Sequence, residues 1–104
     1  MKRVVFLLDA QESLDEITYY TEINWQDSTQ REGSLPEYVV SLIRGCSDIP
    51  RRVQFFSDRS RTTRYGEVFY FRCGHHFIFY RETDDAFEVI QILHERMDFS
   101  AYLD

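Results

Sequence analysis

The hydrophobic repeat of this chain changes from a helical period to a strand period about halfway along. From Ala10 to Trp25, apolar or bulky side chains recur at helical spacing, which predicts an amphipathic helix over about 10–24. A second helical face runs from Leu35 to Cys46. Later segments are short alternating or continuous apolar runs, as in strands. Helices grouped early and strands grouped late predict an α+β fold.

Local signals predict where the first elements begin and end. The apolar run at 3–8 predicts a buried strand, and Asp9 with Glu12 forms a capping box that is expected to begin the first helix. A polar loop is expected over 26–33. Because a short linker joins two helices that would each be marginal alone, we expect them to pack as an antiparallel helical hairpin.

The second helix carries its own signals. Ser34 and Glu37 form a second capping box, with Pro36 expected in the first turn, where its missing N–H costs nothing. Gly45 is a plausible end of this helix. These signals predict a second helix whose apolar face runs from Leu35 to Cys46.

The second half of the chain predicts three or four antiparallel strands. Alternation over 53–57 indicates one strand, and Gly74 indicates a hairpin turn between two aromatic strands. Residues 83–85 mark the next turn. The mostly apolar run 87–93 predicts a strand inside the sheet, and the tail 97–103 has room for one helical turn.

Charge is distributed unevenly along the 104 residues, although the formal net charge is −6. Residues 1–48 carry four basic and nine acidic side chains, a balance of −5. Residues 49–81 carry seven Arg and two acidic side chains, a balance of +5, and residues 82–104 carry one Arg and seven acidic side chains, a balance of −6. The acidic total argues against a surface that attracts nucleic acid everywhere. The basic, aromatic centre suits RNA bases or a protein partner.

Length and motif content exclude several function classes. The chain fits a single domain over residues 1–104, with no apolar segment near the roughly 18 residues of a membrane span. Two cysteines are too few for a disulfide framework, so a cytoplasmic protein with reduced thiols is expected. There is no glycine-rich phosphate loop, no metalloprotease helix motif and no paired Cys-x-x-Cys. We expect no cofactor.

Cys73, His75 and His94 are the residue types of a metal site, but the sequence does not predict one. His75 and His76 would point to opposite faces of a strand, so they could not share one ion without distortion. We therefore expect no bound metal.

The C-terminal third carries a more specific pattern. His76-Phe77-Ile78-Phe79-Tyr80-Arg81 is followed by an acidic turn and by Val89-Ile90-Gln91-Ile92-Leu93-His94-Glu95-Arg96-Met97-Asp98. This pattern closely resembles the ParE toxins of bacterial ParDE toxin–antitoxin modules. The earlier order of a strand, a helix ending at Trp25 and a second helix ending near Pro50 is similar too.

The resemblance implies a RelE/ParE-like fold, with an N-terminal strand and a helical hairpin packed on a small antiparallel sheet. It implies a non-enzymatic toxin that inhibits DNA gyrase by binding and is neutralised by a cognate, ParD-like antitoxin. Direct DNA recognition and membrane binding are not expected. A groove beside the helical hairpin would suit an amphipathic partner helix.

Two sets of binding residues are expected on this reading. The residues expected to contact the target are Arg72, Arg81, His94, Arg96, Met97 and Asp98. The residues expected to contact the antitoxin are Leu14, Ile17, Tyr20, Tyr38, Leu42, Arg59, Arg61 and Arg64. Truncation from Met97 onward is expected to reduce toxicity more than antitoxin binding.

Two alternatives remain open on the sequence. A RelE-like, ribosome-dependent mRNA endoribonuclease needs an acid, a base and cations around the scissile phosphate. The residues available for those roles are Tyr80, Arg81, His94 and Arg96. The other alternative is a toxin-like protein with weakened activity.

Overall fold

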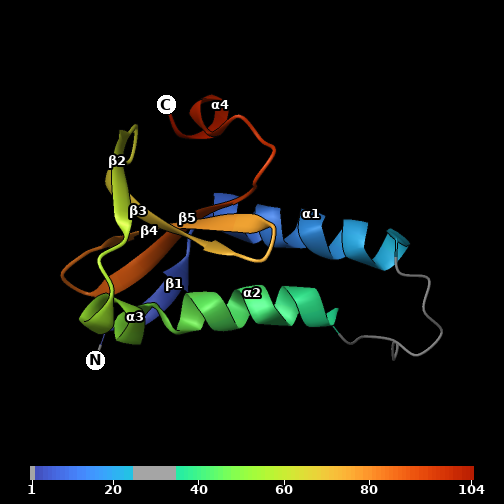
Figure 1. The fold of residues 1–104 in the computed structure, drawn as a ribbon, viewed down its shortest axis with the longest axis horizontal. Helices are drawn as coiled ribbons and strands as arrows, with labels where there is room; N and C mark the ends of the chain where they lie inside the picture. The colour runs from blue at the N-terminus through green and yellow to red at the C-terminus, as the bar shows by residue number, and fades with distance from the viewer. Residues whose placement is uncertain (1, 25–34) are drawn as a thin grey trace.

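The computed structural model of the protein describes residues 2–24 and 35–104. Its elements are, in chain order, β1 (Arg3–Phe6), α1 (Leu8–Asn24), α2 (Glu37–Ser47), α3 (Ile49–Phe55), β2 (Arg59–Thr63), β3 (Gly66–Cys73), β4 (His76–Glu82), β5 (Ala86–His94) and α4 (Phe99–Leu103) (Figure 1). This order confirms the predicted α+β class. The polar loop predicted over 26–33 and the residue Ser34 of the second capping box lie outside the described residues.

The five strands form one sheet in the order β1-β5-β4-β3-β2. The pairs β2–β3, β3–β4 and β4–β5 are antiparallel. Strand β1 instead pairs parallel with β5, with Arg3 facing Ala86 and Phe6 facing Val89. The predicted buried strand at 3–8 is therefore a shorter, partly exposed edge strand. The run predicted to lie inside the sheet is confirmed as β5, which is flanked by β1 and β4.

Alternation along β4 divides the core between the two faces of the sheet. Ile78 and Tyr80 join the buried cluster that α1, α2 and α3 cover. Phe77 and Phe79 point to the other face, where both rings contact Phe99 of α4 at centroid distances of 5.4 and 5.2 Å. Figure 1 shows α4 and α2 on opposite sides of the strands. The tail thus forms the predicted helical turn as α4, and this helix covers one face of the sheet.

An irregularity in β5 explains why this strand reads as continuously apolar. Phe79 pairs with Gln91 but Tyr80 pairs with Val89, so Ile90 is an extra residue in the ladder. The bulge resets the alternation by one position. Val89 and Ile92 therefore both reach the helix-covered cluster, while Ile90 reaches the opposite one.

The predicted strand over 53–57 is wrong, because the structure forms helix α3 there. Pro50 lies in the first turn of α3, where its fixed backbone favours a helix, and it is buried together with Ile49. Val53 and Phe55, which carried the apparent alternation, are 37% and 71% exposed. These apolar side chains therefore lie on the surface of α3 and do not form the buried face of a strand.

The predicted helix ends also need correction. Helix α1 begins at Leu8, and the Asp9 carboxylate accepts a hydrogen bond from the Tyr65 hydroxyl at 2.8 Å instead of capping the helix. Helix α2 has Pro36 at its N-cap with no side-chain cap hydrogen bond. Gly45 lies inside α2, where a Cβ would stand 3.1 Å from the Cys73 Sγ, so close packing against β3 explains this glycine better than a helix end does.

Strand β2 was not predicted, because its five residues contain no apolar side chain. It pairs with β3 along its whole length and forms the edge of the sheet. Other turns agree with prediction. Gly74 adopts φ +63° in the β3–β4 turn, and the turn before β5 is closed by a hydrogen bond from the Thr83 N–H to the Ala86 carbonyl at 2.8 Å.

Candidate functional site

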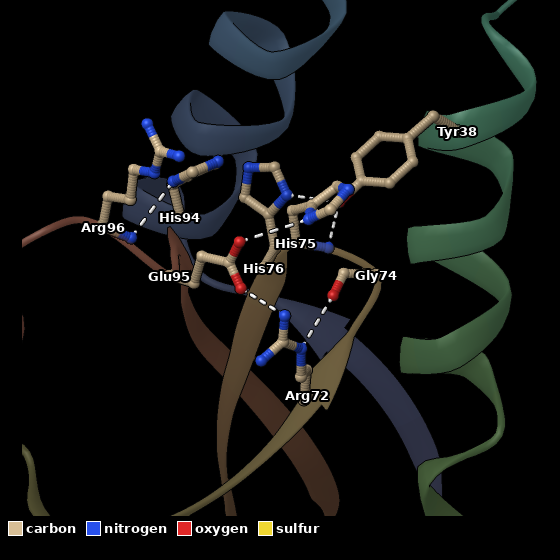
Figure 2. A network of polar contacts seen from close by, with 8 residues as sticks. All are labelled: Tyr38, Arg72, Gly74, His75, His76, His94, Glu95 and Arg96. Atoms are coloured by element: carbon tan, nitrogen blue, oxygen red, sulfur yellow. Dashed lines mark hydrogen bonds and ion pairs between the residues drawn. The ribbon is translucent and has the colours of Figure 1, made fainter.

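A network of polar contacts lies where the β3–β4 turn meets the end of β5 (Figure 2). His76 begins β4 and pairs with His94, the last residue of β5. Their rings meet edge to face, with centroids 5.1 Å apart. The His75 ring lies 6.5 Å from the His94 ring. Sheet register therefore gathers all three histidines of the chain.

Tyr38 of α2 fixes the protonation pattern of His76. The Tyr38 hydroxyl accepts a hydrogen bond from the His75 backbone N–H at 3.0 Å, and it lies 2.5 Å from the His76 Nδ1. Burial raises the pKa of Tyr38, so the phenol keeps its proton, and we assign the His76 Nδ1 as its acceptor because the hydroxyl has no other acceptor among the described residues. His76 is 8% exposed, and burial, with the neighbouring His94 and His75, lowers its pKa to about 4. At neutral pH His76 is thus uncharged, with its proton on Nε2.

Gly74 is required by this arrangement. Its φ of +63° favours glycine, and a Cβ at this position would stand 2.8 Å from the Tyr38 ring. The Tyr38 side chain therefore packs directly on the backbone of the β3–β4 turn. This contact couples α2 to the histidines.

Arg72 and Glu95 hold the outer side of the same turn. The Arg72 Nε donates to the Gly74 carbonyl at 3.0 Å, and its Nη2 forms an ion pair with the Glu95 carboxylate. Glu95 also accepts from the His75 Nδ1 at 3.2 Å, and the Glu95 N–H donates to the His75 carbonyl. The hydrogen bond with His75, followed by the charge of Arg72, lowers the pKa of Glu95. The ion pair between Arg72 and Glu95 therefore persists to acidic pH.

The segment after β5 is folded back onto His94. The Arg96 N–H donates to the His94 Nδ1 at 3.1 Å, and the Met97 N–H donates to the His94 carbonyl at 2.9 Å. An accepting Nδ1 leaves the His94 proton on Nε2. The Arg96 and Met97 side chains remain exposed beside it.

A cleft of about 200 Å³ opens next to the histidines, between α1 and the end of β5. Its walls include the two imidazoles of His76 and His94, the buried Gln91, and side chains from the first turns of α1. Among the described residues, no group of three His, Cys, Asp or Glu side chains is arranged to hold a metal ion. The polar groups that the cleft presents are imidazoles, an amide and the carboxylates of α1.

A comparison with known families decides which kind of protein carries this site. The sequence model described as "ParE toxin of type II toxin-antitoxin system, parDE" matches residues 4–99. The chain belongs to the ParE toxin family. ParE toxins pair with a cognate ParD antitoxin, and the observed strand–helix–sheet order is consistent with the RelE/ParE fold. No curated protein matches the chain. Over the described residues, no helix is both long and apolar enough to cross a lipid bilayer.

In this ParE-family toxin, five of the six expected target-contacting residues lie at the histidine end of the sheet, namely Arg72, His94, Arg96, Met97 and Asp98. Asp98 also has a structural role, since its carboxylate caps α4 by accepting from the Ser100 N–H at 3.1 Å. Arg81 lies apart from this group. Its guanidinium donates to Glu88 and to the Tyr65 carbonyl, both at 2.7 Å.

The four residues considered for an endoribonuclease are not brought together. Tyr80 and Arg81 stand four and five positions from His76 along β4, which separates them from His94 and Arg96 by more than about 10 Å of strand. Tyr80 is buried, and its hydroxyl donates to Asp58 at 2.7 Å. Burial, followed by this bond to Asp58, raises the pKa of Tyr80. The proposed acid–base set is thus divided between two regions of the toxin.

The helical residues expected to contact the antitoxin have different environments. Leu14 lines a groove of about 560 Å³ between α1 and α2, which lies where the sequence placed a groove beside the hairpin. Ile17 lines the histidine cleft instead, Tyr20 is 65% exposed, and Tyr38 is engaged with the histidines. Leu42 is fully buried in the core, so its expected contact with a partner is corrected.

The arginines expected to contact the antitoxin lie on and beside the edge strand β2. Arg61 pairs with Asp104 at 3.2 Å, and Arg64 lies 3.9 Å from Asp9. Arg59 is exposed, with no hydrogen bond or ion pair to another described side chain. Of these three arginines, Arg61 and Arg64 thus have carboxylates nearby, whereas Arg59 has no partner among the described residues.

Sequence reasoning missed two roles that organise the site. Glu95 holds the turn through Arg72 and His75, and Tyr38 orients His76 from 38 positions away. The glycine in an aromatic hairpin was a local signal for the turn. Nothing near Tyr38 in the sequence indicates that its hydroxyl contacts a histidine.

Proposed function

We propose that this ParE-family toxin acts in the cytoplasm by binding DNA gyrase and inhibiting it without catalysing a reaction, and that the whole chain forms one toxin domain. The observation that carries the proposal is the family match over residues 4–99. The separation of Tyr80 and Arg81 from His94 and Arg96 supports a binding mechanism, because general acid–base chemistry needs its groups within hydrogen-bond reach of one substrate.

We place the target-binding surface at the histidine end. Arg72, Arg96 and Met97 are exposed there on backbone that Tyr38 and Glu95 hold in place. Arginine and large apolar side chains on a rigid support are typical of interface hot spots, because little conformational entropy is lost on binding. Arg81 is left out of this surface because it lies five positions from His76 along β4, away from the histidine end.

We place the ParD-like antitoxin on the other side of α1. The groove between α1 and α2 is lined by Leu14, Leu35, Val39 and Ile43, which suits the apolar face of an amphipathic helix. Arg59, Arg61 and Arg64 suit an acidic extension of the same partner, because Arg59 has no described partner and the exposed pairs of Arg61 and Arg64 with Asp104 and Asp9 are weak. The groove takes residues from α1 and α2, whereas the proposed target surface is carried by β3 and the segment after β5.

The test compares two activities of the purified chain. The toxin is added to a gyrase supercoiling and cleavage-complex assay and, separately, to a translating extract in which mRNA ends are mapped. Inhibited supercoiling with intact mRNA supports the proposal. Cut mRNA without an effect on gyrase would overturn it in favour of the endoribonuclease, and an inert chain in both assays would mean a toxin with weakened activity.

Truncation from Met97 onward is not a clean test of the target surface. Leu103 is fully buried, and its carbonyl accepts from the Arg64 N–H at 2.8 Å. Removing the tail would therefore open one face of the core and lower stability. Substitutions of exposed side chains, such as Arg96→Ala, separate binding from folding.

A further inference from the structure

The histidine cleft carries two N–H groups that no described residue accepts from. Tyr38 and the Arg96 N–H occupy the Nδ1 atoms of His76 and His94, so each ring presents Nε2–H. Both rings line the cleft, and Figure 2 shows the free nitrogen of His76 on the side of His94. His76 is more than nine-tenths buried. Two donors that face each other in this way favour an acceptor oxygen between them.

The wall opposite the histidines is negatively charged and unneutralised. Glu12 and Glu16 of α1 line the cleft and form no ion pair with any described residue, whereas Asp9 is held by Tyr65 and approached by Arg64. Because they are four positions apart on a helix, the two glutamates are neighbours that repel each other. Among the described residues that line the cleft there is no Lys or Arg. A bound cation would relieve this repulsion.

The size and remaining walls fit a side chain better than a single ion. A volume of about 200 Å³ exceeds the roughly 30 Å³ that one water occupies in the liquid several times over. Ile17, Met97 and Tyr102 supply apolar surface, and Met97 and Tyr102 are 40% and 42% exposed. Such surface suits the methylene stem of Lys or Arg, whose charged head then reaches a carboxylate.

We propose that the histidine cleft binds a basic segment of the target protein: a Lys or Arg side chain pairs with Glu12 and Glu16, and a main-chain carbonyl of the same segment accepts from His76 and His94. The proposal rests on the proposed function in assigning this segment to the target. The cleft lies beside Arg96 and Met97, and its α1 residues are on a different face from Leu14, which lines the antitoxin groove.

The first experiment uses peptide probes with the full-length chain. Acetyl-Gly-Gly-Arg-Gly-Gly-amide is titrated while the imidazole nitrogens of His76, His94 and the exposed His75 are followed by NMR. We expect saturable shifts at His76 and His94. The same peptide with Glu in place of Arg should leave them unchanged. Absent shifts, or equal shifts with the Glu peptide, would overturn the proposal.

Charge variants show whether the carboxylates act as proposed. Glu12→Gln/Glu16→Gln should weaken binding of the Arg peptide about tenfold, since two partly exposed ion pairs together amount to about 1.4 kcal/mol. Glu37→Gln/Glu67→Gln removes the same charge from exposed positions outside the cleft and should leave binding unchanged. Equal weakening in both variants would mean that net charge, and not the cleft, attracts the peptide.

The second experiment assigns the source of the segment. The same two variants are compared in the gyrase supercoiling assay, where only Glu12→Gln/Glu16→Gln should require more toxin for inhibition. If this variant binds the peptide weakly but inhibits gyrase normally, the segment does not come from gyrase. If the wild-type chain does not inhibit gyrase, the proposed function fails, and the peptide titration still decides what the cleft binds.

Discussion

Two polar clusters of this toxin combine an arginine, a carboxylate and a tyrosine, but they differ in how many of their hydrogen-bonding groups are paired. Around Asp58, the Arg52 guanidinium donates three hydrogen bonds at 2.8–3.1 Å and the Tyr80 hydroxyl donates a fourth at 2.7 Å. The guanidinium also stacks over Phe71, 4.1 Å from the ring centroid. The Asp58 side chain is 5% exposed. Both oxygens of the Asp58 carboxylate are therefore engaged within the cluster.

The histidine end contains the same residue types, but some of its hydrogen-bonding groups are unpaired. Arg72, Glu95 and Tyr38 are paired within it, whereas the Nε2 atoms of His76 and His94 have no acceptor among the described residues. Since no buried side-chain nitrogen or oxygen of the described residues lacks a hydrogen-bond partner, these two Nε2 atoms open onto solvent in the cleft. The comparison teaches that the Asp58 cluster serves folding, and that the histidine end retains hydrogen-bonding capacity that a partner can use.

The largest expected effect is the loss of the Asp58 carboxylate. Asp58→Ala leaves the Arg52 charge without its partner and should lower the free energy of unfolding by about 3–5 kcal/mol, measured by urea denaturation. Asp104→Ala, which breaks the exposed pair with Arg61, should cost less than about 1 kcal/mol. Similar losses for the two variants would show that the Asp58 cluster is not the structural brace described here.

A somewhat smaller effect is expected from protonating His76. Its pKa is lowered to about 4 in the folded toxin, while an unfolded histidine titrates near 6.5. Below pH 6.5 the unfolded chain binds the extra proton first, so stability should fall as pH drops toward 4, by on the order of 3 kcal/mol. Denaturation midpoints at pH 7 and pH 4.5 measure the slope.

Two substitutions serve as controls for this pH dependence. His76→Asn removes the titrating ring and should flatten the slope between pH 6.5 and 4. His75→Gln removes an exposed ring and should leave most of the slope in place. A steep slope that survives His76→Asn would assign the acid sensitivity to other groups.

The smallest expected effect concerns the contact between Tyr38 and the turn. Gly66 and Gly74 both have positive φ, but a Cβ meets the Tyr38 ring only at Gly74, since nothing lies within 4 Å at Gly66. Gly66→Ala should cost about 1 kcal/mol for its backbone conformation alone. Gly74→Ala should cost about 1 kcal/mol more, because the ring must move. Equal thermal shifts in the two variants would mean that Tyr38 does not hold the turn.

Where local sequence signals were strong, they predicted the fold. Helical spacing from Ala10 onward predicted α1, and Gly74 between two aromatic runs predicted the β3–β4 hairpin. The resemblance over residues 76–98 predicted the family, which the match over 4–99 confirms. These features depend on residues close together in the chain.

The remaining features depend on contacts between distant residues or on weak local patterns. Strand β2 has no apolar residue and is held through its backbone pairing with β3. Helix α3 is stabilised by the bond from Arg52 to Asp58, which a hydrophobic pattern does not record. The candidate site likewise depends on Tyr38 reaching His76 from another element.

The measurement that most directly tests the account is gyrase inhibition by two matched double variants. Arg96→Ala/Met97→Ser changes the histidine end, and Arg51→Ala/Phe55→Ser makes the same kind of change at exposed positions of α3 near the Asp58 cluster. The account predicts that the first variant needs about tenfold more toxin to inhibit supercoiling, while the second matches the wild type. Normal inhibition by the first variant, or equal loss in both, would contradict it.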